Sequence, residues 1–329
     1  MNSRERIMKA LNLEQPDRVP FADYAEEAIR KKIMGKEHFT AAEFAEKIGF
    51  DAINLDQDYT APVFCEWKEV DGHRFMLGGL IKEDKDLDRM VFQYPDDHCF
   101  YDPAKRFVEE MESSGLAVYA LCRFGISGVL YSMGLDGLSY ALYENPQLVE
   151  RVLDRYVEWN CRMLEKLCAT GIDFILSYDN IAYNSGPMVS PEVFREVFVP
   201  KIKLVDRACK VPWVTHMCGN IMELMEDLLE MGVSGIHPLE PGCMDLKVVK
   251  ELYGKRVCLW GNIDLNYTLT RGTPEEVDAE VKQRIAEAGP GGGYIMGSGC
   301  DLPDYCRVEN ILAMAEAVRK YGCYPLAFN

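Results

Sequence analysis

The sequence predicts an α/β fold, a (β/α)8 TIM barrel with a β-hairpin inserted in its N-terminal half. Three observations support this prediction. Short apolar runs of β-forming residues alternate with longer amphipathic stretches, there are eight such runs, and 329 residues are enough for one barrel. The expected strands cover residues 19–24, 51–55, 117–124, 173–178, 211–217, 235–239, 257–260 and 293–296. A count of eight favours a closed barrel over an open doubly wound sheet.

The helices between these strands are predicted from apolar spacing and from start signals. A helix at 4–13 precedes the first strand, and a second helix at 41–48 connects the first two strands. In the second half, Ser190-Pro191-Glu192 and Thr273-Pro274-Glu275-Glu276 each place a hydroxyl side chain and a proline before an amphipathic stretch. Strands and helices therefore alternate as a βαβ series.

The segment from about residue 59 to about residue 114 interrupts this alternation. Two β-rich runs, Cys65–Val70 and residues 73–77, are separated by Asp71-Gly72, which predicts a hairpin. We expect this segment to be an insertion on a barrel loop that covers one face. The whole chain, residues 1–329, is then a single domain.

The composition excludes several classes of protein. A formal net charge of −17 leaves hardly any basic surface for a nucleic acid. No apolar run reaches the roughly 18 residues of a membrane-spanning helix, and the first six residues are too charged to begin a secretory signal. The twelve cysteines are scattered over a long chain, so we expect reduced thiols. A cytoplasmic protein that binds neither nucleic acid nor membranes follows.

Three side chains at predicted strand ends are the strongest candidates for chemistry. His216 ends one strand and Cys218 directly follows it, so both point to the same side, about 7 Å apart along the strand. Cys300 follows the last strand, after Gly297-Ser298-Gly299. The carboxyl ends of barrel strands meet at one rim, where active sites lie. Two thiolates and an imidazole suit Zn²⁺ and leave a fourth position open, which predicts a catalytic zinc site.

Other polar residues at strand ends are weaker candidates. Glu240 follows the strand at 235–239 and either occupies the fourth zinc position until substrate displaces it or is an obligatory ligand. Asp179 either orients substrate, as a second catalytic candidate, or caps the next helix. Tyr178, Asn262 and Asp264 are candidates for binding the cofactor. Asn262 and Asp264 could also hydrogen-bond substrate or simply shape their loop, and for these two the loop role is favoured.

A second histidine at a strand end, His237, has no assigned role. His237 lies close to Glu240 in the sequence and could support a metal ligand from behind, but we favour a rim histidine whose hydrogen bonds are already satisfied. His38, His73 and His98 lie in a presumed helix, hairpin and loop, and we assign no role to them either.

These residues resemble the uroporphyrinogen decarboxylase superfamily, and within it the branch of methylcobamide and corrinoid-protein methyltransferases. The resemblance spans nearly the whole chain. The segments that carry it are Ser3-Arg4-Glu5-Arg6, Pro16-Asp17-Arg18-Val19-Pro20, residues 171–179, His216-Met217-Cys218-Gly219-Asn220, Gly261-Asn262-Ile263-Asp264, Gly272-Thr273-Pro274-Glu275-Glu276-Val277 and Gly297-Ser298-Gly299-Cys300.

The resemblance implies a TIM barrel and a zinc site made of His216, Cys218 and Cys300. Glu240 is similar to the acidic residue that serves as an exchangeable ligand in the methyltransferase branch. The decarboxylases carry an arginine-rich motif near the N-terminus, whereas residues 19–24 of this chain contain no arginine. Uroporphyrinogen has many carboxylates, which such a site would leave unpaired at considerable cost.

We therefore expect a zinc-dependent methyltransferase that moves a methyl group between a small substrate and the cobalt of a corrinoid. The corrinoid would be supplied by a separate partner protein, because the chain has no region left for a cobalamin-binding domain. Zinc would bind a thiol as thiolate or act as a Lewis acid on a methoxy oxygen, and the sulfur ligands slightly favour the thiol. The hairpin is a candidate contact for the partner. A metal-free tetrapyrrole decarboxylase and a non-catalytic zinc-binding relative are the alternatives.

Overall fold

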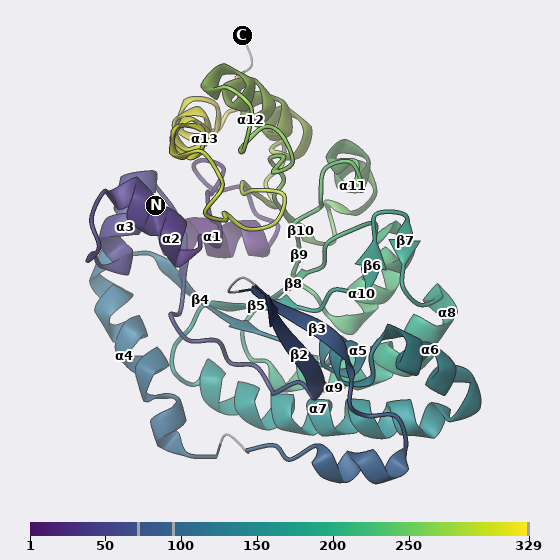
Figure 1. Ribbon diagram of the computed structural model, residues 1–329. Coiled ribbons are helices and arrows are strands. Elements are labelled where there is room, and N and C mark those ends of the chain that lie inside the picture. The colour runs from purple at the N-terminus through teal and green to yellow at the C-terminus, as the bar shows by residue number, and fades with distance from the viewer. Residues whose placement is uncertain (71–72, 94–95, 328–329) are drawn as a thin grey trace.

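Seven parallel strands form one curled sheet in the computed structural model, which describes residues 1–70, 73–93 and 96–327. Helices surround the sheet on the outside (Figure 1). In sheet order the strands are β1 (Ala52–Asn54), β4 (Ala117–Cys122), β5 (Phe174–Tyr178), β8 (Trp213–His216), β9 (Gly235–His237), β10 (Cys258–Trp260) and β11 (Tyr294–Ile295). Each lies within or beside a predicted strand.

The eighth predicted strand closes the barrel between β11 and β1. The Ala22 amide donates to the Met296 carbonyl (3.1 Å), and the Met296 amide donates to the Pro20 carbonyl (2.8 Å). On the other side, the Asp51 amide donates to the Phe21 carbonyl (2.7 Å). The segment therefore bonds to both edges of the seven-stranded sheet, and the predicted (β/α)8 barrel is confirmed.

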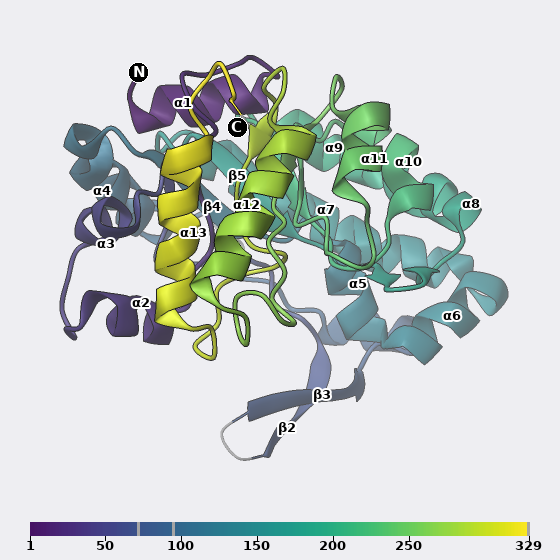
Figure 2. The same ribbon diagram turned by 90° about the horizontal axis from the view of Figure 1, so that it is seen from above.

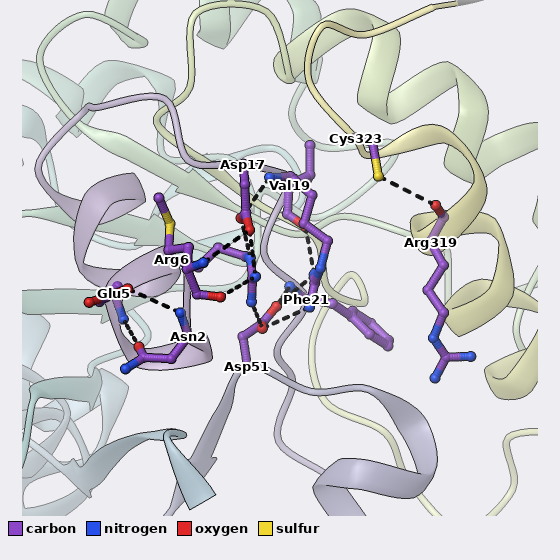
Figure 3. Close-up of polar contacts among 11 residues, drawn as sticks. Asn2, Glu5, Arg6, Asp17, Val19, Phe21, Asp51, Arg319 and Cys323 are labelled. Carbon is purple, nitrogen blue, oxygen red and sulfur yellow. Dashed lines mark hydrogen bonds and ion pairs between the residues drawn. The ribbon is translucent and has the colours of Figure 1, made fainter.

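Charged residues of the N-terminal segment hold this closing strand in place. The guanidinium of Arg6 donates to Asp51 (2.6 Å) and to Asp17 (2.7 Å), and Arg18 donates to Asp51 (2.8 Å). Asp51, which is fully buried, also accepts from the Phe21 amide at 2.9 Å. Figure 3 shows Arg6 between the carboxylates of Asp17 and Asp51, with Phe21 beside Asp51. The N-terminal segments that carry the family resemblance thus serve the architecture.

The helices follow the predicted alternation, and their starts are built as the sequence indicates. Thr273 accepts from the Glu276 amide and donates its own amide to the Glu276 carboxylate, which closes a capping box on α12. The helices are α1 (Ser3–Leu11), α2 (Glu27–Met34), α3 (Ala41–Ile48), α4 (Asp102–Met111), α5 (Ile126–Met133), α6 (Leu135–Glu144), α7 (Pro146–Cys168), α8 (Pro191–Val193), α9 (Val199–Ala208), α10 (Met225–Met231), α11 (Leu246–Tyr253), α12 (Pro274–Ala288) and α13 (Val308–Tyr321). In the part of the chain that the structure describes, none of them could cross a membrane.

A β-hairpin projects from the end of the barrel where the strands terminate. It consists of β2 (Cys65–Val70) paired antiparallel with β3 (His73–Gly79), as predicted, and the expected Asp71-Gly72 turn lies outside the described residues. Figure 2 shows the hairpin at one end of the molecule and α1 at the other. The rest of the predicted insertion includes α4, which leads into β4 as a barrel helix does. The single-domain organisation stays a prediction.

Large side chains fill the barrel interior beneath the strand ends. The rings of Tyr119 and Phe174 stack with their centroids 4.8 Å apart, and Trp260 packs against both. All three are buried. The interior is therefore a packed core, and chemistry is confined to the rim above it.

Candidate metal centre

The structure brings His216, Cys218 and Cys300 together at the rim. The Nε2 atom of His216 lies 3.2 Å from the Cys218 sulfur and 3.9 Å from the Cys300 sulfur, and the two sulfurs are 3.6 Å apart. A tetrahedral zinc ion, about 2.3 Å from sulfur and about 2.05 Å from nitrogen, would hold its ligand atoms roughly 3.5–3.8 Å apart. The three side chains thus already have the spacing of a zinc site.

The backbone around Cys218 explains why its thiol turns toward His216. Gly219 has a φ of +85°, and a Cβ there would lie 2.7 Å from the Tyr183 carbonyl oxygen, so this bend requires glycine. The Cys218 amide donates to the Asn180 side chain (2.9 Å), and the Gly219 amide donates to the Glu240 carboxylate (2.8 Å). The loop is therefore anchored on both sides of the ligand.

The two thiols differ strongly in acidity. Hydrogen bonding by the Cys300 thiol, helped by His216, lowers the pKa of Cys218 to about 5 although burial opposes ionisation. The pKa of Cys300 is raised, chiefly because its thiol donates to Cys218 and also because it is buried. One sulfur is therefore poised as a thiolate. A divalent cation between the two sulfurs would favour ionisation of both.

His237 contacts the cluster, which contradicts the expectation of a satisfied rim histidine. Its Nδ1 lies 2.8 Å from Nδ1 of His216, and its Nε2 is buried without a hydrogen-bond partner among the described residues. Burial, with a smaller contribution from His216, keeps the pKa of His237 well below its ordinary value, so the ring is neutral. The contact could have been expected from the sequence, because both histidines end neighbouring strands.

Tyr178 lies between the cluster and a cavity of about 170 Å³. Its ring centroid is 4.3 Å from that of His216, and its hydroxyl is buried without a hydrogen-bond partner in the described part of the chain. The cavity is lined by Tyr24, Asp58, Thr60, Leu121, Cys122, Arg123, Tyr178 and Asp301. Asp301 directly follows the predicted ligand Cys300, so the cavity adjoins the cluster.

The charged residues of this cavity were missed by the sequence analysis. Burial raises the pKa of Asp58, and the Arg123 guanidinium partly offsets this effect. Arg123 and Thr60 also line a larger neighbouring cavity of about 900 Å³. Asp58 follows the predicted strand at 51–55, and Arg123 lies at the end of the predicted strand at 117–124. These positions were the available signal, but neither residue belongs to a recognisable motif.

The two predicted catalytic carboxylates are engaged by the backbone. Glu240 accepts from the Gly219 amide and lies outside the three-residue cluster found among the described residues. Asp179 is buried and accepts from the Phe124 amide (2.7 Å), the Ser127 amide (3.0 Å) and the Ser127 hydroxyl (3.1 Å). Asp179 therefore anchors the loop between β4 and α5, and the catalytic roles of both residues stay predictions.

The predicted cofactor-binding residues beyond β10 are also tied into the fold. The Asn262 side chain donates to the Leu239 carbonyl (2.6 Å), while its own oxygen is buried without a partner among the described residues. Asp264 accepts from the amides of Asn266 (2.9 Å) and Tyr267 (3.0 Å), as in a loop cap. Asn262 thus keeps a free acceptor, whereas Asp264 serves its own turn.

Comparisons with known proteins find a family model, curated relatives and a solved structure that match this chain. The family model for uroporphyrinogen decarboxylase (URO-D) matches residues 86–321. Methylcobamide:CoM methyltransferase MtaA of Methanosarcina barkeri is 27% identical over 174 residues, which cover 53% of this chain and 49% of that protein. The chain thus spans about half the length of this relative. MtbA of Methanosarcina mazei, another methylcobamide:CoM methyltransferase, is 24% identical over 97% of this chain and 98% of its own length.

Uroporphyrinogen decarboxylases match as well, over about half of this chain. The uroporphyrinogen decarboxylase of Alkalilimnicola ehrlichii is 25% identical over 183 residues, which cover 54% of this chain and 48% of that protein. Among solved structures, a methyltransferase from Methanosarcina mazei superimposes with a TM-score of 0.78 at 21% identity, covering 98% of this chain and 99% of that one. This likeness supports the barrel fold.

Proposed function

We propose that this chain, which belongs to the uroporphyrinogen decarboxylase (URO-D) family, is a zinc-dependent methyltransferase that moves a methyl group between a small substrate and the cobalt of a corrinoid protein. The observation that carries this proposal is the cluster of one imidazole and two sulfurs at the barrel rim. A decarboxylase has no need of such a soft-metal ligand set. Two of the relatives that match this chain are named methylcobamide:CoM methyltransferases.

The ligand residues determine what the site can do. When bound, Zn²⁺ supplies a Lewis acid that binds a thiol as thiolate or polarises a methoxy oxygen. Nε2 of His216 and the sulfurs of Cys218 and Cys300 would hold it and leave a fourth position open toward substrate. Two thiolate ligands add negative charge, which keeps a substrate thiolate nucleophilic and favours a thiol over an ether.

The small substrate is proposed to bind in the cavity beside the cluster. Tyr178 packs on His216 and lines this cavity. Its buried hydroxyl has no hydrogen-bond partner among the described residues, so it is suited to hydrogen-bonding a substrate atom. In either direction of transfer, one bond to the methyl carbon forms as another breaks, and the electron pair of the broken bond stays with the atom that the methyl group leaves. The cavity residues position the substrate and exclude water from this exchange.

The charges of the two cavities disfavour the alternative, tetrapyrrole decarboxylation. Among the described residues that line them there is one guanidinium, Arg123, and three carboxylates, Asp58, Asp301 and Asp97. Uroporphyrinogen has many carboxylates, which would meet this negative surface with a single guanidinium to pair with. The cavities therefore suit a smaller substrate that is not polyanionic.

The corrinoid protein is proposed to dock against the β2–β3 hairpin. Phe75 and Leu77 of β3 are 53% and 62% exposed, and Trp67 of β2 is 43% exposed. Exposed apolar side chains of this size mark interaction surfaces when they gather on one element. Figure 2 shows the hairpin at the end of the molecule opposite α1. The hairpin follows the carboxyl end of β1, and the cluster residues follow or end β8 and β11, so a partner bound to the hairpin would be on the same side of the barrel as the site.

Replacing Phe75 and Leu77 together by serine should raise the KM for a methylated corrinoid protein about tenfold, because docking loses two apolar contacts. The kcat with free methylcobalamin and the zinc content should not change. Steady-state kinetics with both methyl donors measure the difference. Leu252→Ser, an equally exposed leucine on α11, is the matched control. An unchanged KM in the double variant would remove the hairpin from the docking surface.

The proposed activity is tested by two measurements on the purified chain. Elemental analysis should find about one zinc per chain, and mixing with a methylated corrinoid protein and a thiol should change the cobalt absorbance as the methyl group leaves. Zinc without any absorbance change would indicate a non-catalytic zinc-binding protein. Absence of zinc together with turnover of a tetrapyrrole would establish the decarboxylase instead.

A further inference from the structure

His237 and His216 form a buried pair at the barrel rim. They are aligned partners in the register of β8 and β9, so their side chains emerge beside each other at the rim. Their Nδ1 atoms are 2.8 Å apart, and the two residues are 0% and 2% exposed. At this distance one ring must donate a proton and the other must accept it.

The sulfur atoms decide which ring donates. Both lie near Nε2 of His216, at 3.2 and 3.9 Å, so a metal held by the cluster takes the lone pair of that nitrogen. A neutral imidazole that ligates through Nε2 carries its proton on Nδ1. The Nδ1–H of His216 then donates to Nδ1 of His237, and the proton of His237 must sit on its Nε2.

The surroundings of Nε2 of His237 show that packing alone does not explain why a histidine stands at this position. Its Nε2 is buried and has no hydrogen-bond partner among the described residues, and its ring centroid lies 4.8 Å from that of Trp260. A buried N–H without a partner is unfavourable, so a phenylalanine ring would fill the same space at lower cost. The histidine is explained by the acceptor that it offers to His216.

We infer that His237 is a positioning residue, which fixes the tautomer and ring orientation of His216 for metal binding; this inference rests on the proposed function. Ligating histidines usually donate to a carboxylate, a carbonyl or a water molecule. A neutral imidazole in that place adds no negative charge to a site that already has two thiolates. It thereby preserves the Lewis acidity that a more anionic surrounding would reduce.

Zinc affinity tests this role without recourse to activity. His237→Phe keeps the ring and the contact with Trp260 but removes the acceptor, and it should weaken zinc binding 10- to 100-fold in a chelator competition. In His237→Asn the amide oxygen stands where Nδ1 stood, so affinity should stay within about threefold of the parent. The absorption bands of the Co²⁺-loaded protein should shift in H237F and return toward the parent bands in H237N.

A neighbouring substitution controls for general disturbance of β8. The Thr215 hydroxyl is also buried without a partner among the described residues, one position before His216, so Thr215→Val should leave zinc affinity unchanged. The Tm of each metal-free variant, compared with that of the parent, shows whether the variant is folded. If the Tm of H237F is well below that of the parent, His237→Leu is measured in its place. If a folded H237F or H237L bound zinc as tightly as the parent, the role inferred for His237 would be overturned, but the proposed function would not. Failure of the parent protein to bind zinc would instead refute the proposed function.

Discussion

Replacing Cys300 by serine is expected to reduce zinc from about one ion per chain to trace amounts and to abolish methyl transfer. The hydroxyl of serine is a far weaker ligand than a thiolate for a borderline-soft ion. Cys300 supplies one of the two cluster sulfurs, 3.6 Å from the other, and among the described residues the cluster has no further member. We expect zinc affinity to fall at least 100-fold, since even outer partners of a ligand account for 10- to 100-fold.

Elemental analysis and the cobalt absorbance assay measure the two parts of this expectation. Cys306→Ser is the matched control, because Cys306 is a buried free cysteine six positions further along the same rim segment and is not in the cluster. It should retain both zinc and transfer. A C300S protein that still holds one zinc per chain would show that the three side chains do not share an ion.

Replacing Asp179 by alanine is expected to lower the free energy of unfolding by about 2–5 kcal/mol, which is the range for breaking a buried charged network. The substitution leaves two buried backbone amides, those of Phe124 and Ser127, without their acceptor. Burial raises the pKa of Asp179, and the hydrogen bonds from Phe124 and Ser127 lower it in part. Urea denaturation of the metal-free protein measures the effect.

A second loop carboxylate shows whether burial is responsible. Asp264 also accepts two backbone amides, but in a partly exposed turn where water can replace it, so Asp264→Ala should cost about 1 kcal/mol or less. If D179A unfolded like the parent but had lost methyl transfer, the structural role would be wrong and Asp179 would be catalytic. A lower free energy of unfolding in D179A supports the role of Asp179 as an anchor of the loop.

The sequence was sufficient for features that depend on local periodicity. Apolar runs and helix start signals located all eight barrel strands, and a polar turn between two β-rich runs located the hairpin. The cluster was found in the same way, because His216 and Cys218 alternate onto one side and the carboxyl ends of parallel strands meet at one rim. The ligand candidates followed from side-chain chemistry together with these positions.

The position of the closing strand in the barrel could not be predicted from the local sequence pattern. Residues 19–24 were recognisable as a strand, but their place between β11 and β1 depends on Asp51, which binds Arg6, Arg18 and the Phe21 amide. These partners are far apart in the sequence. The same segments were part of the family resemblance, yet nothing in them indicated whether they served chemistry or architecture.

Partner choice at the rim was decided by the tertiary structure. His237 supports His216 because the register of β8 and β9 aligns them, and a shift by one residue would turn His237 to the opposite face. Asp179 anchors a loop because the β4–α5 segment folds over it, and Glu240 faces the Gly219 amide instead of the sulfurs.

The sequence by itself determined the barrel, the hairpin and the three cluster residues, since periodicity and side-chain chemistry are local properties. Register, burial and the cavity bounded by Tyr24, Asp58 and Tyr178 required three dimensions, because each joins atoms from separate strands.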